Sequence, residues 1–391
     1  MAGPSVAPPS LYRRRMSLRR YTIPVGSDRW YVSGRTETAF NWDYDSGRDR
    51  LLALYEKGKA KQWNAATLID WSADLDFADQ EAFPDFYLPI YGSDAFESMS
   101  RQEKDTVRHH YIAWLFSQFL HGEQGALVCA SKIVQTVPDV DSKFYAATQV
   151  MDEARHVEAY SRFLNEKVDL AYPINPHLAG LLDQTISDAR WDMTYLGMQV
   201  MIEGVALAAF GMIRDLTRHP LTRSINAYVM KDEARHVAFG LLALQDAYRD
   251  LTEAERLERE EFVVEASYLL RDRFLGQEVW ANLGLDVDEC VGYVEQAQVM
   301  SMYRMNLFSR VVPTVKRIGI WGDKVQRAFE DMGVIAFESM EPAELFVNDE
   351  RIANDLEAEI AALREQRPGD APAPVSRTHE LAEAIIAGEE G

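Results

Sequence analysis

The pattern of hydrophobic and polar positions along this chain is helical almost throughout. Apolar residues recur three and four positions apart over long stretches, which is the spacing of a helix with one buried face. No stretch of any length alternates between apolar and polar residues as a half-buried strand does. The sequence therefore predicts an all-α fold, with long helices at about 100–137, 141–167, 187–217, 220–250 and 252–275.

Capping residues and prolines mark where these helices begin and end. Ser100 with Glu103 and Thr252 with Glu255 form capping boxes, and Asp141 is expected to cap the second long helix. Further helices are expected at 46–62, 177–187, 287–311, 313–333, 341–365 and 377–388. The expected organisation is a disordered arm at 1–20, an irregular and helical wrap at 21–99, a bundle at 100–250, accessory helices at 251–366 and a flexible tail at 367–391.

Composition excludes several functional classes. The 391 residues, 47% hydrophobic and 26% charged, are ordinary for a soluble globular protein with a large core. A net charge of −21 disfavours a nucleic-acid partner, which needs a basic face. The two cysteines, Cys129 and Cys290, make no disulfide framework, which fits the cytoplasm. The longest clean apolar run, at about 204–213, is far short of the ~20 residues of a membrane span, so none is expected.

A duplicated hexapeptide stands out from this background. Asp-Glu-Ala-Arg-His-Val begins at Asp152 and again at Asp232, 80 residues later. A further glutamate precedes the glutamate of each copy by 30 residues, and these two glutamates are also 80 residues apart. A glutamate and a histidine three positions apart point to one side of a helix. The six repeated side chains are Glu123, Glu153, His156, Glu203, Glu233 and His236.

Helix geometry places these six side chains in one layer. Glu123 lies about 14 residues before the turn at Pro138 and Glu153 about 12 residues after Asp141, or ~20 Å out and ~18 Å back along an antiparallel hairpin. The second half repeats this spacing, so two hairpins packed face to face form a four-helix bundle. A glutamate on each of two helices and Glu-x-x-His on the other two is the pattern of di-iron and di-manganese carboxylate bundles.

Charge strengthens the metal interpretation over a chance pair of salt bridges. Four unpaired carboxylates on apolar helix faces would cost many kcal/mol, which two divalent cations would offset. Oxygen and imidazole ligands without thiolate favour iron or manganese. Asp152 and Asp232 are expected to accept the imidazole N–H of the opposite half, with Arg155 and Arg235 pairing with those aspartates.

On these residues the chain resembles the ferritin-like di-iron carboxylate superfamily over about residues 100–250. It is similar to the members with an Asp-Glu-x-Arg-His box in both halves, namely bacterial multicomponent monooxygenase hydroxylases, the ribonucleotide reductase small subunit and di-iron N-oxygenases. Residues 54–64 also resemble the segment before the bundle in some of these oxygenases. The resemblance implies two irons that react with dioxygen when ferrous, six ligands as above, and bridging roles for Glu153 and Glu233.

Three neighbours of the repeat separate this chain from its relatives. Leu207 stands where the multicomponent hydroxylases carry a threonine, and Val229 where p-aminobenzoate N-oxygenases carry an extra histidine. A seventh protein ligand is therefore not supported at that position. Tyr160 stands where the ribonucleotide reductase small subunit has a tyrosine, so it is a candidate for radical chemistry and, alternatively, a packing residue.

The expected function is a non-haem di-iron monooxygenase that hydroxylates or N-oxygenates a small organic substrate with dioxygen. No flavin, Rossmann or iron–sulfur motif is present, so an external ferredoxin or flavin reductase is expected, and a homodimer is typical of such oxygenases. The alternatives are an oxidase or desaturase using Tyr160, and a non-enzymatic iron-binding protein, which the chain outside the bundle disfavours. Candidate cavity residues, which could equally be core, are Gln124, Leu127, Leu207, Phe210 and Phe239.

Overall fold

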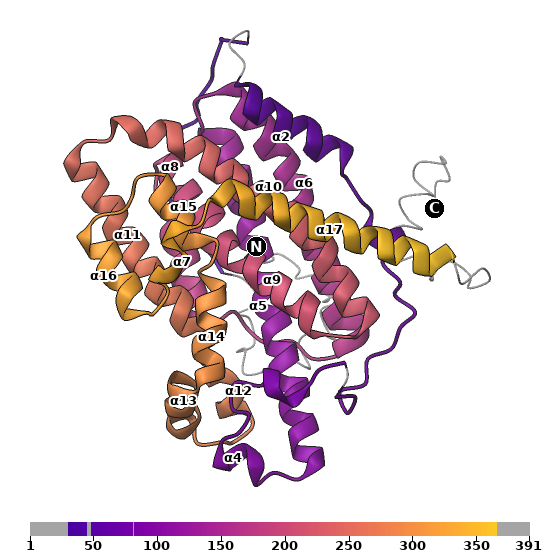
Figure 1. Cartoon of the computed structure of the whole chain (residues 1–391). Helices are drawn as coiled ribbons and strands as arrows, with labels where there is room; N and C mark the ends of the chain where they lie inside the picture. Colours follow the sequence, from indigo (N-terminus) through magenta and orange to yellow (C-terminus); the bar gives the residue numbers. More distant parts are fainter. Residues whose placement is uncertain (1–29, 45–47, 81, 366–391) are drawn as a thin grey trace, which may run out of the picture.

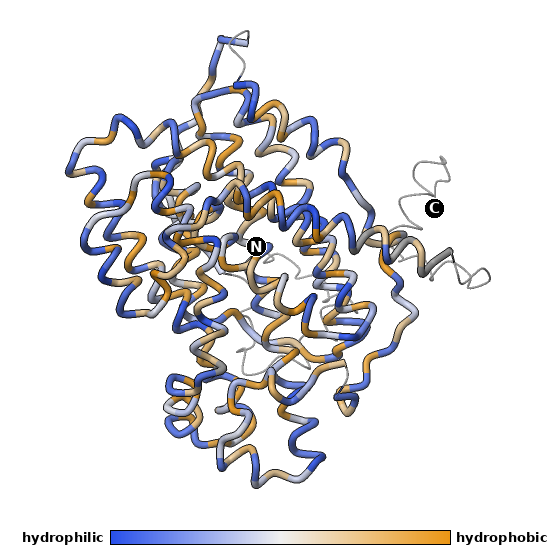
Figure 2. The backbone as a smooth tube through the Cα atoms, viewed as in Figure 1, coloured by the Kyte–Doolittle hydropathy of each residue, from blue (hydrophilic) through white to orange (hydrophobic). Residues whose placement is uncertain are grey.

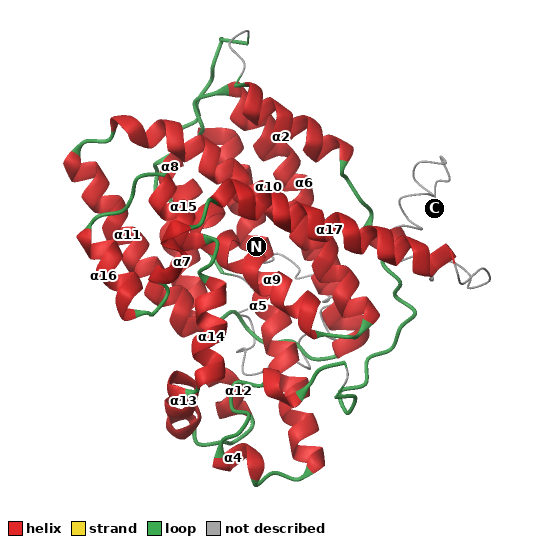
Figure 3. Ribbon diagram, in the orientation of Figure 1, coloured by secondary structure: helices red, strands yellow, loops and turns green. Residues whose placement is uncertain are grey.

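The computed structural model describes residues 30–44, 48–80 and 82–365. Helices make up nearly all of the regular structure, and the described residues contain no β-strand (Figure 3). The prediction of an all-α fold is confirmed. The expected arm at 1–20 and the expected tail with its helix at 377–388 lie outside the described residues.

Four helices form the centre of the molecule. They are α5 (Arg101–Thr136), α6 (Val140–Phe163), α9 (Glu203–Leu216) and α10 (Pro220–Ala247). Helix α5 packs along α6 and α9 packs along α10, each pair joined by a connection of three residues, and α6 also contacts α10. Two helical hairpins therefore face each other, which is the ferritin-like four-helix core. We call α5–α6 the first hairpin and α9–α10 the second hairpin.

The helix caps follow the sequence with one exception. Both capping boxes form as predicted, at Ser100 and at Thr252. The prediction for α6 was wrong, because Asp139 caps this helix by accepting the backbone N–H of Ser142 at 2.8 Å. The helix thus begins two residues after Pro138, with Asp139 as the last residue of the connection. Asp141 lies inside the first turn of α6, where it accepts the backbone N–H of Arg48.

The third long helix is not regular. The expected helix at 187–217 is resolved into α8 (Trp191–Tyr195), a π-helical segment η3 (Leu196–Ile202) and α9, which begins at Glu203. A π-helical turn inserts extra residues into a helix and re-aims the side chains after it. Gly197 lies where a Cβ would come within 2.4 Å of the Thr185 hydroxyl oxygen, so a neighbouring helix approaches closely here.

This same stretch, Trp191–Leu216, is the one described helix long and apolar enough to cross a membrane by length and composition. It is longer than the apolar run expected from the sequence. In the structure 78% of its most apolar window is buried inside the protein. Core helices of globular proteins pass the same test, and here the apolar surface is covered by neighbouring helices.

Accessory helices cover the bundle from several sides (Figure 1). Helix α2 (Asp49–Ala60) packs on α6 and α10, and α17 (Pro342–Glu365) runs across α10. On another side α11 (Glu253–Asp272) packs against α7 (Pro176–Ser187) and α16 (Asp323–Asp331). The remaining helical segments are α3 (Ala65–Leu68), η1 (Asp85–Tyr87), α4 (Asp94–Glu97), η2 (Leu164–Val168), η4 (Tyr248–Asp250), η5 (Arg273–Leu275), α12 (Gln277–Asn282), α13 (Val287–Gln296), α14 (Gln298–Leu307), α15 (Val311–Arg317) and η6 (Ile335–Ser339).

Two expected helices near the C-terminal end are broken. The helix expected at 287–311 divides into α13 and α14 because Ala297 has an extended backbone. The helix expected at 313–333 ends early because Gly319 adopts a left-handed conformation, with φ of 84°.

Most helices in Figure 2 carry both hydrophobic and hydrophilic residues along their length, as helices with one buried face do. The apolar faces meet in one continuous core around the four central helices.

Candidate metal centre

The six repeated side chains converge between the two hairpins. Helix α5 contributes one glutamate, α9 contributes one glutamate as its first residue, and α6 and α10 each contribute a glutamate and a histidine. All six are at most 5% exposed. The structure therefore brings together the whole set that the sequence repeat singled out: Glu123, Glu153, His156, Glu203, Glu233 and His236.

Two groups of these side chains could each hold a metal ion. One group is Glu123, Glu153, His156 and Glu233, and the other is Glu153, Glu203 and His236. Within each group the ligand atoms lie within 4.8 Å of one another. Glu153 belongs to both groups, so its carboxylate lies between them.

The two carboxylates on α6 and α10 each face both histidines. For Glu153, Oε2 lies 3.3 Å from Nδ1 of His156 and Oε1 lies 3.1 Å from Nδ1 of His236. For Glu233, Oε1 lies 3.2 Å from Nδ1 of His156 and Oε2 lies 3.5 Å from Nδ1 of His236. A carboxylate with one oxygen on each side is the geometry of a bridging ligand between two metal ions.

The unpaired polar atoms of the cluster fit a pair of cations. Oε2 of Glu153, Glu203 and Glu233 and Nδ1 of His236 are buried without a hydrogen-bond partner among the described residues. Buried polar atoms left unpaired are costly, and these are all atoms that bind iron or manganese. The donor set contains no thiolate. The cluster is a buried carboxylate and histidine metal-binding site.

The pKa directions in the cluster indicate the same need for positive charge. Burial raises the pKa of the Glu123 and Glu203 carboxyls well above the ordinary value, and the neighbouring glutamates add to this effect. Burial alone would lower the pKa of His156 and His236, but the adjacent carboxylates hold it well above the ordinary value. Metal ions compete with these protons, because bound ligands are deprotonated.

A second layer of side chains orients the histidines. Nε2–H of His156 donates to Oδ2 of Asp232 at 3.1 Å, and Nε2 of His236 lies 3.3 Å from Oδ2 of Asp152. Each histidine thus uses the aspartate of the opposite hairpin, which leaves Nδ1 facing the glutamates. Arg155 and Arg235 each pair with both aspartates, at 2.8 Å for Arg155 with Asp232 and 3.3 Å for Arg235 with Asp152. Such outer contacts fix the tautomer and the ring orientation of metal-binding histidines.

Two residues of the segment after α2 join this layer, and sequence analysis did not assign them. Nε1–H of Trp63 donates to Oδ2 of Asp232 at 2.7 Å, and Nε2–H of Gln62 donates to Oδ1 of Asp152 at 2.8 Å. The guanidinium of Arg155 lies 4.8 Å from the Trp63 ring centroid. The resemblance of residues 54–64 to a segment of known oxygenases marked this region but not these contacts.

A third unassigned residue touches the glutamates themselves. Nε2–H of Gln149 donates to Oε1 of Glu153 at 3.0 Å and to Oε1 of Glu203 at 2.8 Å. Gln149 is fully buried on α6, one turn before Glu153. The helical spacing of four residues was the one signal in the sequence that could have found it.

Tyr160 lies on the His156 side of the cluster. It is fully buried, and its hydroxyl donates to Oδ1 of Asn226 at 3.2 Å. Burial raises its pKa well above the ordinary value, with Glu123 and Glu233 adding to the shift. Its ring packs against Phe210, with the ring centroids 5.9 Å apart. The hydroxyl is therefore neutral and held in place.

The five candidate cavity residues do not gather at one site. Gln124 is exposed and Leu127 is half-buried, so neither lines a space within the buried cluster. Leu207 and Phe210 are buried on α9, and Phe239 packs in a different aromatic group, 4.3 Å from the ring of Tyr145. The last three are therefore core residues near the centre.

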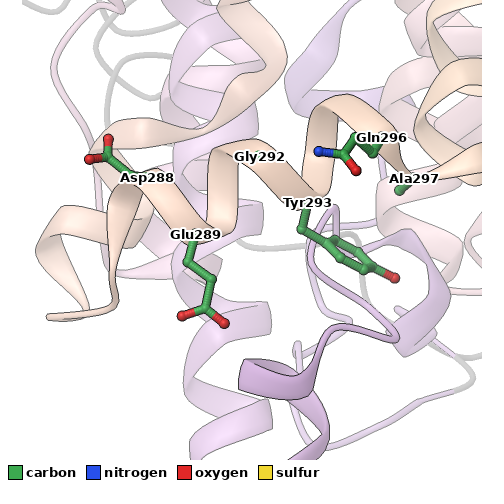
Figure 4. Close-up of a pocket in the computed structure, with 6 residues that line it drawn as sticks. All are labelled: Asp288, Glu289, Gly292, Tyr293, Gln296 and Ala297. Carbon is green, nitrogen blue, oxygen red and sulfur yellow. The ribbon is translucent and has the colours of Figure 1, made fainter.

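Two surface hollows lie at α13. One is lined by Asp288, Glu289, Gly292, Tyr293, Gln296 and Ala297 (Figure 4). The Tyr293 ring extends from α13, and its hydroxyl donates to the backbone carbonyl of Tyr91 at 2.7 Å. The adjoining hollow is lined by residues of 92–95 and of α13. Neither contains a residue of the metal centre.

Fold and site together define a ferritin-like helical protein with a buried two-site carboxylate centre. The family described as P-aminobenzoate N-oxygenase AurF matches residues 45–319, which include the whole centre. The chain belongs to this family of di-iron N-oxygenases, and it is accordingly an oxidoreductase that acts on dioxygen and a substrate. Membership holds although Val229 stands at the place of the extra histidine noted above.

No curated protein matches the chain. Among solved structures it is similar to variants of R2-like ligand-binding oxidases with reconstituted Mn/Fe cofactors. A tyrosine-to-phenylalanine variant has 18% identity and a TM-score of 0.37, with 68% of this chain and 94% of that chain covered. A glycine-to-phenylalanine variant has 21% identity and a TM-score of 0.38, with 72% and 96% covered.

Proposed function

We propose that this chain is a di-iron monooxygenase that oxygenates the amino group of a small aromatic amine. This proposal rests on the two ligand groups that share Glu153, in a chain that belongs to the N-oxygenase family. We assign Glu123 and His156 to one ion, Glu203 and His236 to the other, and Glu153 and Glu233 to both. Iron is the proposed metal in both positions, and manganese fits the same donors.

Bound ions would supply the electrons and the Lewis acidity for dioxygen reduction. The protein's part is to hold the ligands and exclude water. The aspartates keep Nε2–H on each histidine, so that Nδ1 stays free to bind metal. The overall reaction takes one amine, one dioxygen, two electrons and two protons. One oxygen atom forms an N–O bond to give the hydroxylamine, and the other leaves as water.

The test is reconstitution with Fe(II) followed by dioxygen, a chemical reductant and p-aminobenzoate as the probe amine. We expect about two irons per chain and a hydroxylamine product whose new oxygen comes from labelled dioxygen. Glu153→Ala should abolish both. Binding of many more irons, or no two-ion loading of the wild-type chain, would contradict the proposal.

A second candidate is an oxidase or desaturase that removes hydrogen without inserting oxygen. The observation that favours it is Tyr160, a fully buried tyrosine on the His156 side of the cluster. The two functions differ in their products. Labelled oxygen in the organic product supports oxygenation, whereas label found only in water, together with a tyrosyl radical signal, supports the oxidase.

Electrons would come from an external ferredoxin or flavin reductase in the cytoplasm. Both cysteines are free and buried, in keeping with a reducing compartment. We also propose a homodimer. The segment before α2 carries highly exposed aromatic side chains, with Phe40 and Trp42 each 82% exposed, which a partner chain could cover. Light scattering of the purified chain tests this arrangement.

A further inference from the structure

The two halves of the centre differ at the positions that flank the ligands. In the 80-residue repeat, Gln149 of the first half corresponds to Val229 of the second half. Gln199 of the second half corresponds to Phe119 of the first half. The first hairpin supplies a buried amide at the first position and a phenyl ring at the second. The second half supplies an isopropyl group from α10 and an amide from η3. Both amides therefore lie at positions where the two halves carry different residues, and the two amides are hydrogen-bonded to each other.

The hydrogen bonds of the amide pair lie on the side of the centre that contains Glu203 and His236. Gln149 donates to Oε1 of Glu203 at 2.8 Å, which leaves Oε2 of this glutamate as its unpaired atom. It also donates to Oε1 of Glu153 at 3.0 Å, the oxygen of that carboxylate that faces His236. Nε2–H of Gln199 donates in turn to Oε1 of Gln149 at 3.4 Å. Both amides are fully buried. Glu203 thus has one oxygen occupied by an amide and one oxygen free.

The backbone makes room for this arrangement. Gln199 lies in the π-helical segment η3, four residues before Glu203. A Cβ at Gly240 would lie 2.6 Å from Cβ of Gln199, so any larger residue there would displace the amide. The residue 80 positions before Gly240 is Tyr160. The glycine leaves room for the amide, whereas the other half has a tyrosine at the position of the glycine and a phenylalanine at that of the amide.

Glu123 on the other side has no such support. Among the described residues its carboxylate has one hydrogen-bond partner, Nδ1 of His156 at 3.1 Å, and this atom is itself assigned to a metal ion. The position corresponding to Gln149 is Val229, which donates no side-chain hydrogen bond. Phe119 packs with Phe210 and Tyr160, with ring centroids 4.8 and 5.8 Å from its own. The surroundings of this side are aromatic.

We propose that Gln149, held by Gln199, makes the two ion positions unequal by fixing Glu203 as a one-oxygen ligand. The inference rests on the proposed two-ion function. The position beside His236 is then the tighter one, with a restrained carboxylate. The position beside His156 would keep Glu123, a carboxylate that no side-chain amide restrains. Gln149 acts through Glu203 and is a positioning residue.

The first test uses the wild-type protein with less metal than it can hold. One equivalent of Mn(II) is added to metal-free protein, and crystals are measured at the manganese absorption edge. We expect most of the anomalous signal at the position beside His236. Equal occupancy, or preference for the position beside His156, would overturn the inference, as would an amide oxygen of Gln149 bound to the ion.

The second test uses Gln149→Met, which keeps a similar volume but donates no hydrogen bond. Titration with Mn(II), followed by electron paramagnetic resonance of the free ion, should give about 10–100-fold weaker binding at one position, as for other lost outer contacts of metal ligands. The other position should weaken less, because it loses only the contact of Gln149 with the shared Glu153. Gln199→Met should give a smaller effect in the same direction.

Val229→Ala is the matched control, because it truncates the corresponding buried residue of the other half and removes no hydrogen bond. It should leave the preference between positions unchanged. Unchanged binding in Gln149→Met, or equal weakening of both positions, would overturn the inference even when the wild-type chain holds two ions. A wild-type chain that fails to bind two ions would instead refute the proposed function. Circular dichroism of each metal-free variant checks that it folds.

Discussion

Nε2 of His156 lies 3.1 Å from Oδ2 of Asp232, a residue 76 positions further along the chain in the opposite hairpin. The same oxygen accepts Nε1–H of Trp63 and is paired with Arg155. The reciprocal contact joins His236 to Asp152. The orientation of each histidine is therefore set by the other hairpin.

Asp232→Asn should weaken both metal binding and stability. The amide cannot balance the charge of the two buried arginines, and breaking a buried ion pair in this way costs about 3–5 kcal/mol. Affinity for the ion beside His156 should fall about 10–100-fold. Urea unfolding of the metal-free protein and Mn(II) titration measure the two effects. Asp152→Asn is the counterpart and should weaken the ion beside His236, so identical site selectivity in the two variants would refute the crossed arrangement.

Glu153→Ala should lose both ions, because this carboxylate belongs to both ligand groups. The measurement is iron per chain after reconstitution and desalting, with about two expected in the wild type. Glu158→Ala changes an exposed glutamate of the same helix and should retain full loading. A Glu153→Ala protein that still held two irons would show that the ligands are assigned wrongly.

The spacing of the repeat allowed the ligand layer to be predicted from the sequence, because helix pitch converts residue number into height. The crossed aspartates were predicted from the same repeat. Trp63 was not, since a hydrogen bond between elements as far apart as Trp63 and Asp232 leaves no periodic signal. Gln149 was missed although it lies four residues before Glu153 on the same helix. The break at Ala297 was also missed, because a single extended residue does not interrupt the hydrophobic pattern.

Tyr160→Phe and Tyr145→Phe should change the free energy of unfolding differently, although both tyrosines are fully buried on α6. The first variant removes the hydroxyl that donates to Asn226 and should cost about 1 kcal/mol. The Tyr145 hydroxyl has no partner among the described residues, so its removal should be neutral or stabilising. Chemical denaturation compares them. Equal losses in the two variants would mean that the Asn226 contact contributes nothing.

Gly125→Ala and Gly122→Ala test whether helix glycines near the centre serve close packing. A Cβ at Gly125 would lie 2.5 Å from Cδ2 of Leu182, whereas a Cβ at Gly122 would meet nothing within 4 Å. Gly125→Ala should therefore destabilise the protein. Gly122→Ala should stabilise it by about 0.5–1 kcal/mol, through the higher helix propensity of alanine. Thermal unfolding of the metal-free proteins measures both, and a stabilising Gly125→Ala would favour open space there.

The stability of the protein should fall in mild acid through His110. Its Nδ1 lies 2.7 Å from the Tyr172 hydroxyl and 3.1 Å from Nδ2 of Asn282, which donates to that hydroxyl. Burial, with His109 adding to it, lowers its pKa to about 4, against about 6.5 in the unfolded chain. The unfolded state therefore binds more protons between these values. The stabilising contribution is complete above about pH 6.5 and is lost as the pH falls towards 4.

The comparison that isolates this effect is His110→Gln against wild type, both metal-free. The urea midpoint of the variant should fall less steeply with acid, because one of the groups with a lowered pKa has been removed. His109 and His219, whose pKa values burial also lowers, will keep part of the slope. Parallel profiles for the two proteins would exclude His110 as a contributor.

The crossed aspartates also set an order of events during synthesis. When the first hairpin leaves the ribosome, His156 has no acceptor for its Nε2–H, and Glu233 is not yet made. A newly made first hairpin therefore lacks three of the six proposed ligands and the residue that aims its own histidine. A metal pair is therefore expected to load only after the second hairpin has emerged and docked, and a truncated chain ending before Asp232 is expected not to capture it.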